Sequence, residues 1–318
     1  MIPLLVLVGP TSVGKTELSL RLAAHLDAEI VSADSRYLYR GLDIGTAKPG
    51  PAELAHIPHH LVDVTAPDQP WSLAEYKQAA TAAIADIHAR GRLPMLVGGT
   101  GQYVRALLQG WQIPAGGDNL KLRARLTAQA ETAAGLAALH AQLCELDPTG
   151  ALQVDARNPR RVVRALEVCI STGRPFSAQR TRVAPDYRAC QLGLTLPRAE
   201  LYARIDARVD QMLADGLLAE TQALAAQGLA WELPALSALG YRQLGAHLRG
   251  ECSLAEAVLR IKHDTRRFAR RQYAWFSLSN PDITWFDVGR TPLVQIEDHA
   301  VGALKRAGYE VPAGRIGK

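Results

Sequence analysis

Apolar and polar residues alternate along the first third of the chain in a way that predicts strands and helices in turn. Short apolar runs predict buried strands at residues 4–8, 28–32 and 93–97. Apolar residues recur at helical spacing over 18–26 and again over 72–90. The second helix has Ser72 as N-cap with Glu75 at the capping-box position, and Gly91 ends it. This strand–helix rhythm predicts a parallel sheet with helices on both faces.

The pattern changes after Asp118, where Ala, Leu and Arg recur at helical spacing and no strand is convincing. Helices are predicted there at 120–133, 136–146 and 159–172. A strand signal returns at 191–196, and further helices are predicted at 201–213, 217–226, 238–248 and 253–278. The tail from Val301 is expected to fray. The chain is thus divided into a core, first part (1–117), a helical insertion (118–190) and a core, second part (191–318).

Composition is that of an ordinary globular protein, but its charge is unevenly placed. The chain has 318 residues, of which 48% are hydrophobic and 21% charged, which is enough for one large or two modest domains. The net charge is +5. Residues 155–190 hold eight arginines against three acids, and residues 255–275 hold six Lys or Arg against two acids. This distribution favours a basic binding face over a uniformly solvated surface.

The cysteines and the N-terminus indicate a cytoplasmic protein with no membrane partner. The four cysteines lie far apart without a CxxC pair, so we expect buried thiols in a reducing compartment and neither a zinc site nor a disulfide framework. The apolar N-terminal run is too short for a membrane span and has no basic leader.

The first predicted strand leads directly into a glycine-rich motif, G-x-x-x-x-G-K-[ST]. It consists of Gly9, Pro10, Thr11, Ser12, Val13, Gly14, Lys15 and Thr16. The glycines let backbone N–H groups converge on an anion, Lys15 adds a charge, and Thr16 offers a hydroxyl to a metal ion. The motif predicts a phosphate or pyrophosphate site in an α/β fold, a P-loop-type parallel sheet flanked by helices with a helical insertion domain.

Two strand ends carry candidate chemistry beside this loop. Asp34 and Ser35 follow the strand 28–32, and parallel sheets bind ligands at the carboxyl ends of their strands. Asp34 is suited to hold a metal ion, orient a sugar or act as a general base, against the alternative of a solvated strand-end Asp. The strand 93–97 ends in Gly98-Gly99-Thr100-Gly101 and not in an acid, and we expect these glycines to let a ligand approach the backbone closely. The missing acid argues against an ordinary ATPase and favours a phosphate that acts as leaving group.

A loop and a histidine pair follow the second strand. Lys48 is placed to contact a phosphate. The segment His59-His60-Leu61-Val62-Asp63 invites a metal interpretation, but adjacent side chains point in different directions in an extended segment. A packed or hydrogen-bonding role is therefore favoured for His59 and His60.

Two basic helices complete the candidate sites. The segment 158–164 is typical of a helix start because Pro159 suits the first turn, and Arg160 and Arg164 share one face by i,i+4 spacing. Arginines there suit phosphate contacts, with a solvated face as the alternative. Near the C-terminus, one helical stripe holds Lys262, Arg266 and Arg270 among aromatic residues, which suits a nucleic acid, although most of the aromatics are expected in the core.

Together these segments resemble the tRNA dimethylallyltransferase (tRNA isopentenyltransferase) family over residues 4–287. The resemblance rests on SADS at 32–35, YRGLDIGTAKP at 39–49, HHLVD at 59–63, LVGGTGQY at 96–103, NPRRVVRALEV at 158–168, GYRQL at 240–244 and TRRFARRQYAWF at 265–276. Two positions depart from the family pattern: Tyr37 replaces the usual Gln, and Gln102 replaces the usual Leu.

The resemblance implies transfer of the dimethylallyl group from dimethylallyl diphosphate to N6 of adenosine 37, next to the anticodon, in tRNAs that read codons starting with U. It implies that residues 9–16 bind the diphosphate with Mg²⁺ at Thr16, and that the insertion 118–190 binds the anticodon stem-loop. The implied catalytic residues are Asp34 as base for N6, Thr16, Lys15, Arg208 and Thr100. The implied tRNA contacts are Asp34, Ser35, Arg36, Tyr37, Thr100, Arg123, Asn158, Pro159, Arg160, Arg161 and Val162. A monomer is expected.

Two other functions remain open on the residues alone. A small-molecule or nucleoside kinase would use the γ-phosphate of ATP, with Asp34 as base for a hydroxyl. A non-catalytic RNA-binding protein would carry a vestigial nucleotide site, but the intact loop and Asp34 argue against it.

Overall fold

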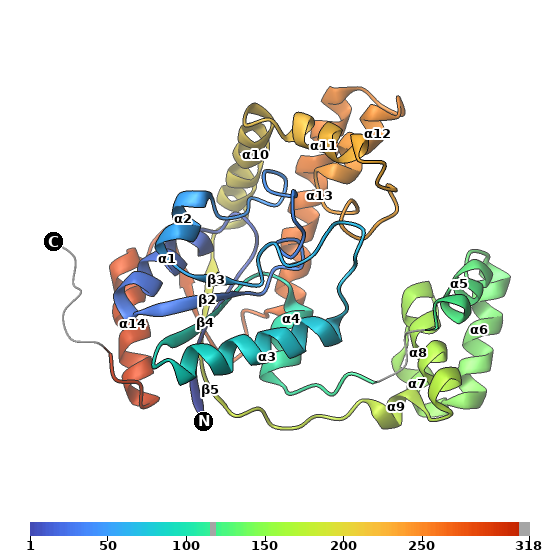
Figure 1. The fold of residues 1–318 in the computed structure, drawn as a ribbon, viewed down its shortest axis with the longest axis horizontal. Coiled ribbons are helices and arrows are strands. Elements are labelled where there is room, and N and C mark those ends of the chain that lie inside the picture. The colour runs from blue at the N-terminus through green and yellow to red at the C-terminus, as the bar shows by residue number, and fades with distance from the viewer. Residues whose placement is uncertain (115–118, 312–318) are drawn as a thin grey trace. The chain divides into compact units, whose positions relative to one another are not determined.

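A six-stranded parallel sheet forms the centre of the larger part of the chain (Figure 1). The computed structural model describes residues 1–114 and 119–311. The strands are β1 (Ile2–Val8), β2 (Ala28–Ser32), β3 (His59–His60), β4 (Leu93–Val97), β5 (Tyr187–Thr195) and β6 (Ile283–Asp287). Their spatial order is β3-β2-β4-β1-β5-β6, and every neighbouring pair is parallel. The predicted parallel α/β sheet is confirmed, and the edge strands β3 and β6 extend it beyond what the apolar runs indicated.

Helices flank this sheet or, in the case of α11 (Leu217–Ala226) and α12 (Tyr241–Leu248), pack on other helices. They are α1 (Lys15–Leu26), α2 (Pro51–His56), α3 (Leu73–Ala89), α4 (Gly101–Leu108), α10 (Arg198–Ala214), α11, α12, α13 (Leu254–Trp275) and α14 (Leu293–Arg306). The predicted frayed tail is wrong over its first part, because α14 runs to Arg306 and buries Ala300 and Leu304 against the core. The last part of that tail, 312–318, lies outside the described residues.

Side chains of the central strand alternate between two cores, as the period of a strand requires. Leu5 and Leu7 of β1 pack in one core with residues of α1, α10 and α14. Leu4, Val6 and Val8 pack in the other core with residues of α3 and α4. All five are fully buried, so the strand is covered on both faces and reads as a continuous apolar run.

The chain divides into two compact units. Unit 1 is Met1–Leu108 with Asp186–Lys318, and unit 2 is Gln109–Pro185. Unit 2 is helical and comprises α5 (Leu120–Gln129), α6 (Ala133–Leu146), α7 (Pro148–Gln153), α8 (Pro159–Thr172) and α9 (Phe176–Gln179). The predicted start of the insertion at 118 lies outside the described residues. Its predicted end at 190 is wrong, because Cys190 lies within β5 and pairs with Leu5 of β1.

All four cysteines are free thiols, as the absence of paired spacing predicts. Their expected burial holds for Cys169 but not for Cys144, which is exposed, and Cys190 and Cys252 are half-buried. None of the helices in the described ranges is long and apolar enough to cross a bilayer.

Candidate active site

The glycine-rich segment forms the turn between β1 and the N-terminus of α1. Gly9 and Gly14 have φ angles of 147° and 106°, which favour glycine, and a Cβ on Gly9 would lie 2.6 Å from the carbonyl oxygen of Leu194. Gly14 supplies no side-chain cap to α1, so the first-turn N–H groups are left for an anion. The Ser12 hydroxyl is buried and has no hydrogen-bond partner among the described residues, which suits a loop that receives a polar ligand.

Lys15 folds back over this loop. Its Nζ donates to the carbonyl oxygens of Gly9 at 3.1 Å and Pro10 at 2.8 Å. Burial lowers the pKa of Lys15 from its ordinary value of 10.5 to about 8, the negative charge of Asp34 raises it, and the positive charge of Arg208 lowers it further. Asp34 follows β2 and Arg208 lies on α10, so two predicted catalytic residues from separate segments come within electrostatic reach of Lys15.

The backbone around Asp34 is held by hydrogen bonds from both sides. One carboxylate oxygen of Asp34 accepts from the N–H of Arg36 at 2.9 Å. Thr100 donates its N–H to the carbonyl oxygen of Ala33 at 3.0 Å, and its hydroxyl accepts from the N–H of Ser35 at 3.1 Å. The ends of β2 and β4 are therefore tied together, which fixes the segment that carries the carboxylate.

Tyr37 lies beside the same charges. Its hydroxyl donates to the carbonyl oxygen of Ala47 at 2.8 Å, and burial together with the charge of Asp34 raises its pKa. The other departure from the family pattern, Gln102, is exposed on α4. Arg36 is bound to the carbonyl oxygen of Pro234 and to the hydroxyl of Ser237, so its guanidinium is already engaged by its own chain.

The glycines after β4 make room for the protein's own atoms. Close ligand approach at this turn stays a prediction, and packing by itself already explains glycine at three of its positions. A Cβ would lie 2.3 Å from the backbone of Ala33 at Gly98, 2.1 Å from Nε2 of Gln272 at Gly99, and 2.2 Å from the Trp275 ring at Gly101. The glycines thus permit tight packing of β2 and α13 against the turn.

Lys48 is a structural residue, and its predicted phosphate contact is wrong. Its side chain is only 3% exposed, and Nζ donates to Asp43 at 2.6 Å and to Asp63 at 2.5 Å. Nζ also donates to the carbonyl oxygen of Tyr39 at 2.9 Å. With its three donors engaged, Lys48 holds the loop at 43–48 to neighbouring segments.

The histidine pair has the predicted hydrogen-bonding role. His60 Nε2 lies 2.7 Å from the buried carboxylate of Glu29, and His59 Nδ1 lies 2.7 Å from the carbonyl oxygen of Ile57. Burial lowers the pKa of His59. Across the described ranges, no group of three or more His, Cys, Asp or Glu residues is arranged to hold a metal ion.

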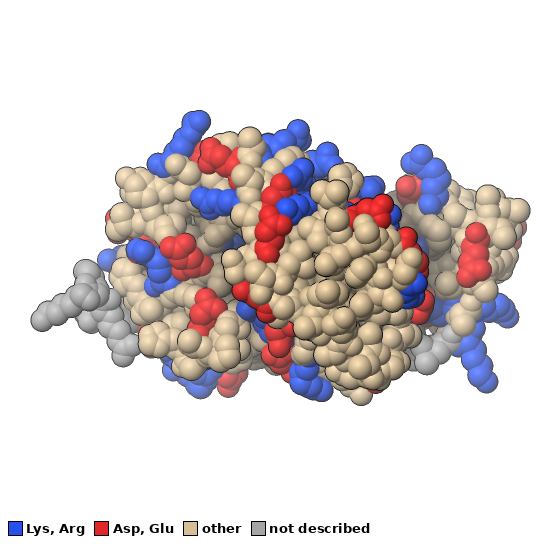
Figure 2. All heavy atoms as spheres, turned by 90° about the horizontal axis from the view of Figure 1, so that it is seen from above, with Lys and Arg blue, Asp and Glu red and all other residues tan. Residues whose placement is uncertain are grey.

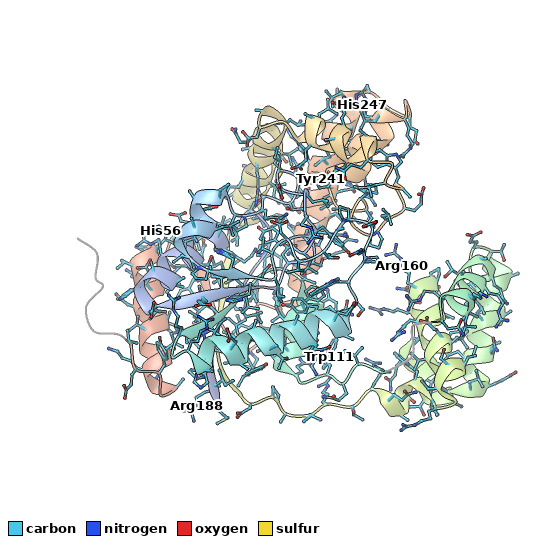
Figure 3. The ribbon with its side chains drawn as sticks, viewed as in Figure 1. His56, Trp111, Arg160, Arg188, Tyr241 and His247 are labelled. Carbon is cyan, nitrogen blue, oxygen red and sulfur yellow. The ribbon has the colours of Figure 1, made fainter. Side chains whose placement is uncertain are left out.

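Two side chains that the sequence analysis passed over hold loops of unit 1. The Glu220 carboxylate accepts from the N–H groups of Asp43, Ile44 and Gly45 and from the hydroxyl of Tyr241. Tyr241, labelled in Figure 3, belongs to the GYRQL segment, but Glu220 stands in no motif. Gln272 lies in the segment 265–276, where the basic and aromatic residues drew the interpretation and the glutamine was given no role.

The basic stripe on α13 is largely neutralised. Lys262 lies 2.6 Å from the carboxylate of Asp210, and Arg266 donates to Asp206 at 2.9 Å, so two of the three stripe residues bind α10. Arg270 is exposed. Figure 2 shows Asp and Glu side chains interspersed among the Lys and Arg side chains on the face that it presents. Ion pairs with α10 therefore engage two of the three stripe residues, and a nucleic-acid role for the stripe stays a prediction.

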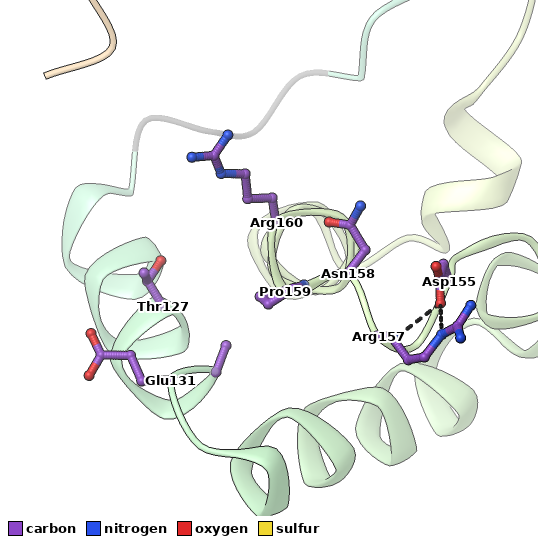
Figure 4. Close-up of a pocket in the computed structure, with 8 residues that line it drawn as sticks. Thr127, Glu131, Asp155, Arg157, Asn158, Pro159 and Arg160 are labelled. Atoms are coloured by element: carbon purple, nitrogen blue, oxygen red, sulfur yellow. Dashed lines mark hydrogen bonds and ion pairs between the residues drawn. The ribbon is translucent and has the colours of Figure 1, made fainter. Parts of the chain in front are cut away.

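In unit 2, several predicted contact residues line one hollow at the start of α8. A cavity of about 620 Å³ is lined by Thr127, Ala130, Glu131, Asp155, Arg157, Asn158, Pro159 and Arg160 (Figure 4). The Asn158 side chain caps α8 by accepting from the N–H of Arg161 at 3.2 Å. Arg160 is exposed and projects from the first turn (Figures 3 and 4). An exposed helix N-terminus with arginines beside it suits an anion.

Two other predicted contacts in unit 2 are less available. Val162 is fully buried in the core of the unit, so its side chain cannot reach a ligand. Arg123 makes a bidentate ion pair with Glu167 at 2.9 Å, and Glu167 also accepts from Arg164. Arg123 is nevertheless 46% exposed beside a second hollow of about 250 Å³ that shares Pro159 and Arg160 with the first.

The fold and site define an α/β protein whose glycine-rich loop joins the first strand of a parallel sheet to the first helix, with a carboxylate after β2, which β4 separates from that first strand. The model of the IPP transferase family matches residues 37–279, and that of isopentenyl transferase matches residues 2–67. The chain belongs to the IPP transferase family.

Curated relatives and solved structures agree with this assignment. The chain is 56% identical over 276 residues to the tRNA dimethylallyltransferase of Roseiflexus sp. (strain RS-1), covering 87% of this chain and 90% of the relative. It resembles the tRNA isopentenylpyrophosphate transferase of Bacillus halodurans with a TM-score of 0.73, 38% identity and coverage of 97% and 98%. It also resembles a eukaryotic dimethylallyltransferase acting on tRNA, with a TM-score of 0.78, 25% identity and coverage of 99% and 82%. These relatives are prenyltransferases, and the kinase alternative finds no support among them.

Proposed function

We propose that this chain is a tRNA dimethylallyltransferase, which transfers the dimethylallyl group from dimethylallyl diphosphate to N6 of adenosine 37 in tRNAs that read codons starting with U. The observation that carries the proposal is the electrostatic cluster of Lys15, Asp34 and Arg208 at one edge of the sheet. It combines two cations for a departing diphosphate with a carboxylate for an attacking amine. Family membership and the tRNA-modifying relatives support the choice of substrates.

The reaction is a substitution at the first carbon of the dimethylallyl group. The bond from N6 to that carbon forms as the carbon–oxygen bond breaks, and its electron pair leaves with the diphosphate. Lys15, Arg208 and the first-turn N–H groups of α1 stabilise the charge that develops on the leaving oxygen. Asp34 accepts the proton lost from N6, a contribution of about 10²–10⁴-fold for general-base help. Thr100 positions the backbone beside Asp34 through its bonds to Ala33 and Ser35.

The residues present suit Mg²⁺ as a cofactor. Thr16 in the first turn of α1 and Asp34 after the end of β2 carry hard oxygen donors. Mg²⁺ takes few protein ligands and fills its other positions with water and phosphate oxygens, so the lack of an acidic cluster in the described ranges is compatible with it. When bound, Mg²⁺ neutralises charge on the diphosphate. Thr16 is the residue that would hold it.

Unit 2 supplies contacts to the anticodon stem-loop in this proposal. Arg160 and Arg161 are exposed in the first turn of α8, where both the arginines and the helix N-terminus favour phosphate oxygens. Ser35, Arg36 and Tyr37 contact the target nucleoside in this proposal, and the Arg36 guanidinium does so by exchanging its bonds to Pro234 and Ser237. The nucleoside must leave the loop stack at a cost of a few kcal/mol. The protein acts as a monomer in the cytoplasm, where its tRNA substrates are found.

The test is a transfer assay with labelled dimethylallyl diphosphate, Mg²⁺ and an unmodified tRNA that carries adenosine at positions 36 and 37. Prenyl label in the RNA, located at adenosine 37 by nuclease digestion and mass spectrometry, is the expected result. A matched tRNA with guanosine at position 37 should remain unlabelled. Phosphate transfer from ATP to a small molecule, without prenyl transfer to RNA, would replace the proposal with the kinase alternative.

A further inference from the structure

One buried amide joins the glycine-rich loop to the turn after β4. The side chain of Gln272 on α13 is 4% exposed. Its Oε1 accepts from the backbone N–H of Thr11 at 2.8 Å, and its Nε2 donates to the carbonyl oxygen of Gly99 at 3.0 Å. Each end of the amide is therefore bound to the backbone of a different loop.

The two loops carry the two halves of the proposed reaction. Thr11 lies in the segment 9–16 that receives the diphosphate. Gly99 precedes Thr100, whose backbone and hydroxyl hold the segment that carries Asp34. A continuous path of hydrogen bonds and backbone therefore leads from the diphosphate loop through Gln272 to the base.

The fit at Gly99 shows that the amide occupies a closely defined place. A Cβ on Gly99 would lie 2.1 Å from Nε2 of Gln272, which leaves no room for any larger residue unless the amide moves. Gly99 does not have a positive φ, so its backbone conformation does not explain why the residue is glycine. The absence of a side chain is therefore accounted for by the approach of Gln272.

We propose that Gln272 is a positioning residue that sets the distance between the diphosphate loop and the Asp34 segment. The proposal rests on the proposed function, because only a reaction between groups held by the two loops requires the loops to lie at a fixed distance from each other. Reacting atoms must lie about 3–3.5 Å apart and in line, and a misplacement of about 1 Å can cost about 10²-fold in rate. Gln272 touches the two loops and acts on the reaction through them.

The test compares Gln272→Met with a matched control, Gln243→Met. Gln243 is also 4% exposed, accepts from the N–H of Gly240 at 3.1 Å and donates to Asp264 at 2.8 Å. Both substitutions remove a buried amide that accepts one hydrogen bond and donates another, so both perturb packing in a similar way. Gly99→Ala provides a second variant, which displaces the Gln272 amide without removing it.

The expected result is a split between kcat and KM. In Gln272→Met and Gly99→Ala, kcat should fall about 10- to 100-fold, while KM for either substrate changes by less than about threefold, since registration matters most in the transition state. Circular dichroism and thermal unfolding establish that each variant is folded at the assay temperature. In Gln243→Met, kcat of the folded protein should stay within about twofold of the unsubstituted protein. Equal kcat losses in Gln272→Met and Gln243→Met would overturn the inference and assign Gln272 to stability alone.

Amide hydrogen exchange gives a readout that is independent of catalysis. In Gln272→Met, the segments around Thr11 and Gly99 should both exchange faster, whereas Gln243→Met should leave both at their original rates. Unchanged exchange in both segments would overturn the inference. If the unsubstituted protein transfers no prenyl group, the proposed function fails, and the exchange data still decide whether Gln272 couples the two loops.

Discussion

The charge of Lys15 makes the binding of pyrophosphate to this protein dependent on pH. Burial holds its pKa at about 8 in the free protein, with Asp34 raising the value and Arg208 lowering it. Because the pKa is lowered, the ammonium is fully charged well below pH 8 and is lost as the pH rises through that value. A bound anion favours the charged form and draws a proton back onto Lys15.

The size of the effect follows from the pKa. At pH 8 about half of Lys15 is neutral, and at pH 9 about nine-tenths is neutral. If the anion requires the ammonium, loss of the Lys15 proton should weaken the affinity for Mg²⁺-pyrophosphate about twofold between pH 6 and pH 8. At pH 9 the affinity should be about tenfold weaker than at pH 6. Binding at pH 8 should also take up about half a proton at Lys15.

Isothermal titration calorimetry measures both quantities. Titrations at pH 8 in two buffers of different ionisation enthalpy give the proton uptake, and a series from pH 6 to 9 gives the affinity. Lys15→Arg is the matched control, because its guanidinium stays charged throughout and the titration of pyrophosphate itself is common to both proteins. The same proton uptake and parallel pH curves in the two proteins would refute the reasoning.

The remaining predictions concern the base, the RNA contacts and a buried carboxylate. Asp34→Asn keeps the acceptor for the Arg36 N–H but loses the charge, so kcat should fall at least about tenfold while tRNA affinity in a filter-binding assay is retained; near-normal turnover would remove the role of base. The double substitution Arg160→Ala with Arg161→Ala should weaken tRNA binding and flatten its dependence on salt, and an unchanged slope would return the pair to a solvated face. Hydrogen bonds, first of all from Arg90, lower the pKa of the 2% exposed Glu29 from 4.5 to about 2. The ionised Glu29 therefore stabilises the fold above pH 4.5 by about 3 kcal/mol at most, and this stabilisation is lost as the pH falls toward 2. In Glu29→Gln, urea unfolding between pH 4.5 and 2 should show a smaller loss of unfolding free energy than the unsubstituted protein, and an identical acid dependence would contradict this.

Elements with a complete local signal were predictable from the sequence. The helix over 159–172 has the predicted bounds, because Asn158 caps its first turn, Pro159 suits that turn and Gly173 ends it with a positive φ of 66°. The glycine-rich loop was predictable for the same reason, since strand, loop and helix are contiguous in the chain. The edge strands β3 and β6 were missed because a two-residue strand and a half-exposed one carry too weak a pattern.

Residue type was a poor guide wherever a distant partner decided the role. Lys48 resembled a phosphate ligand, but its ammonium group is ion-paired with Asp43 and Asp63. The stripe on α13 resembled a nucleic-acid surface, but two acids of α10 neutralise most of it. The role of a charged side chain depends on the charges that the fold places beside it, and those charges come from other helices, strands and loops.

The sequence by itself determined the parallel α/β class and the glycine-rich turn between the first strand and the first helix, because each depends on residues adjacent in the chain or on spacing within one element. Only the tertiary structure decided how these parts are positioned relative to one another. Thr11 and Gln272 are separated by 261 positions, and Gln272 and Gly99 by 173. No local pattern relates residues so far apart, since their meeting depends on how α13 packs against the sheet. That packing, and not the glycine-rich motif, ties the glycine-rich loop to the turn after β4.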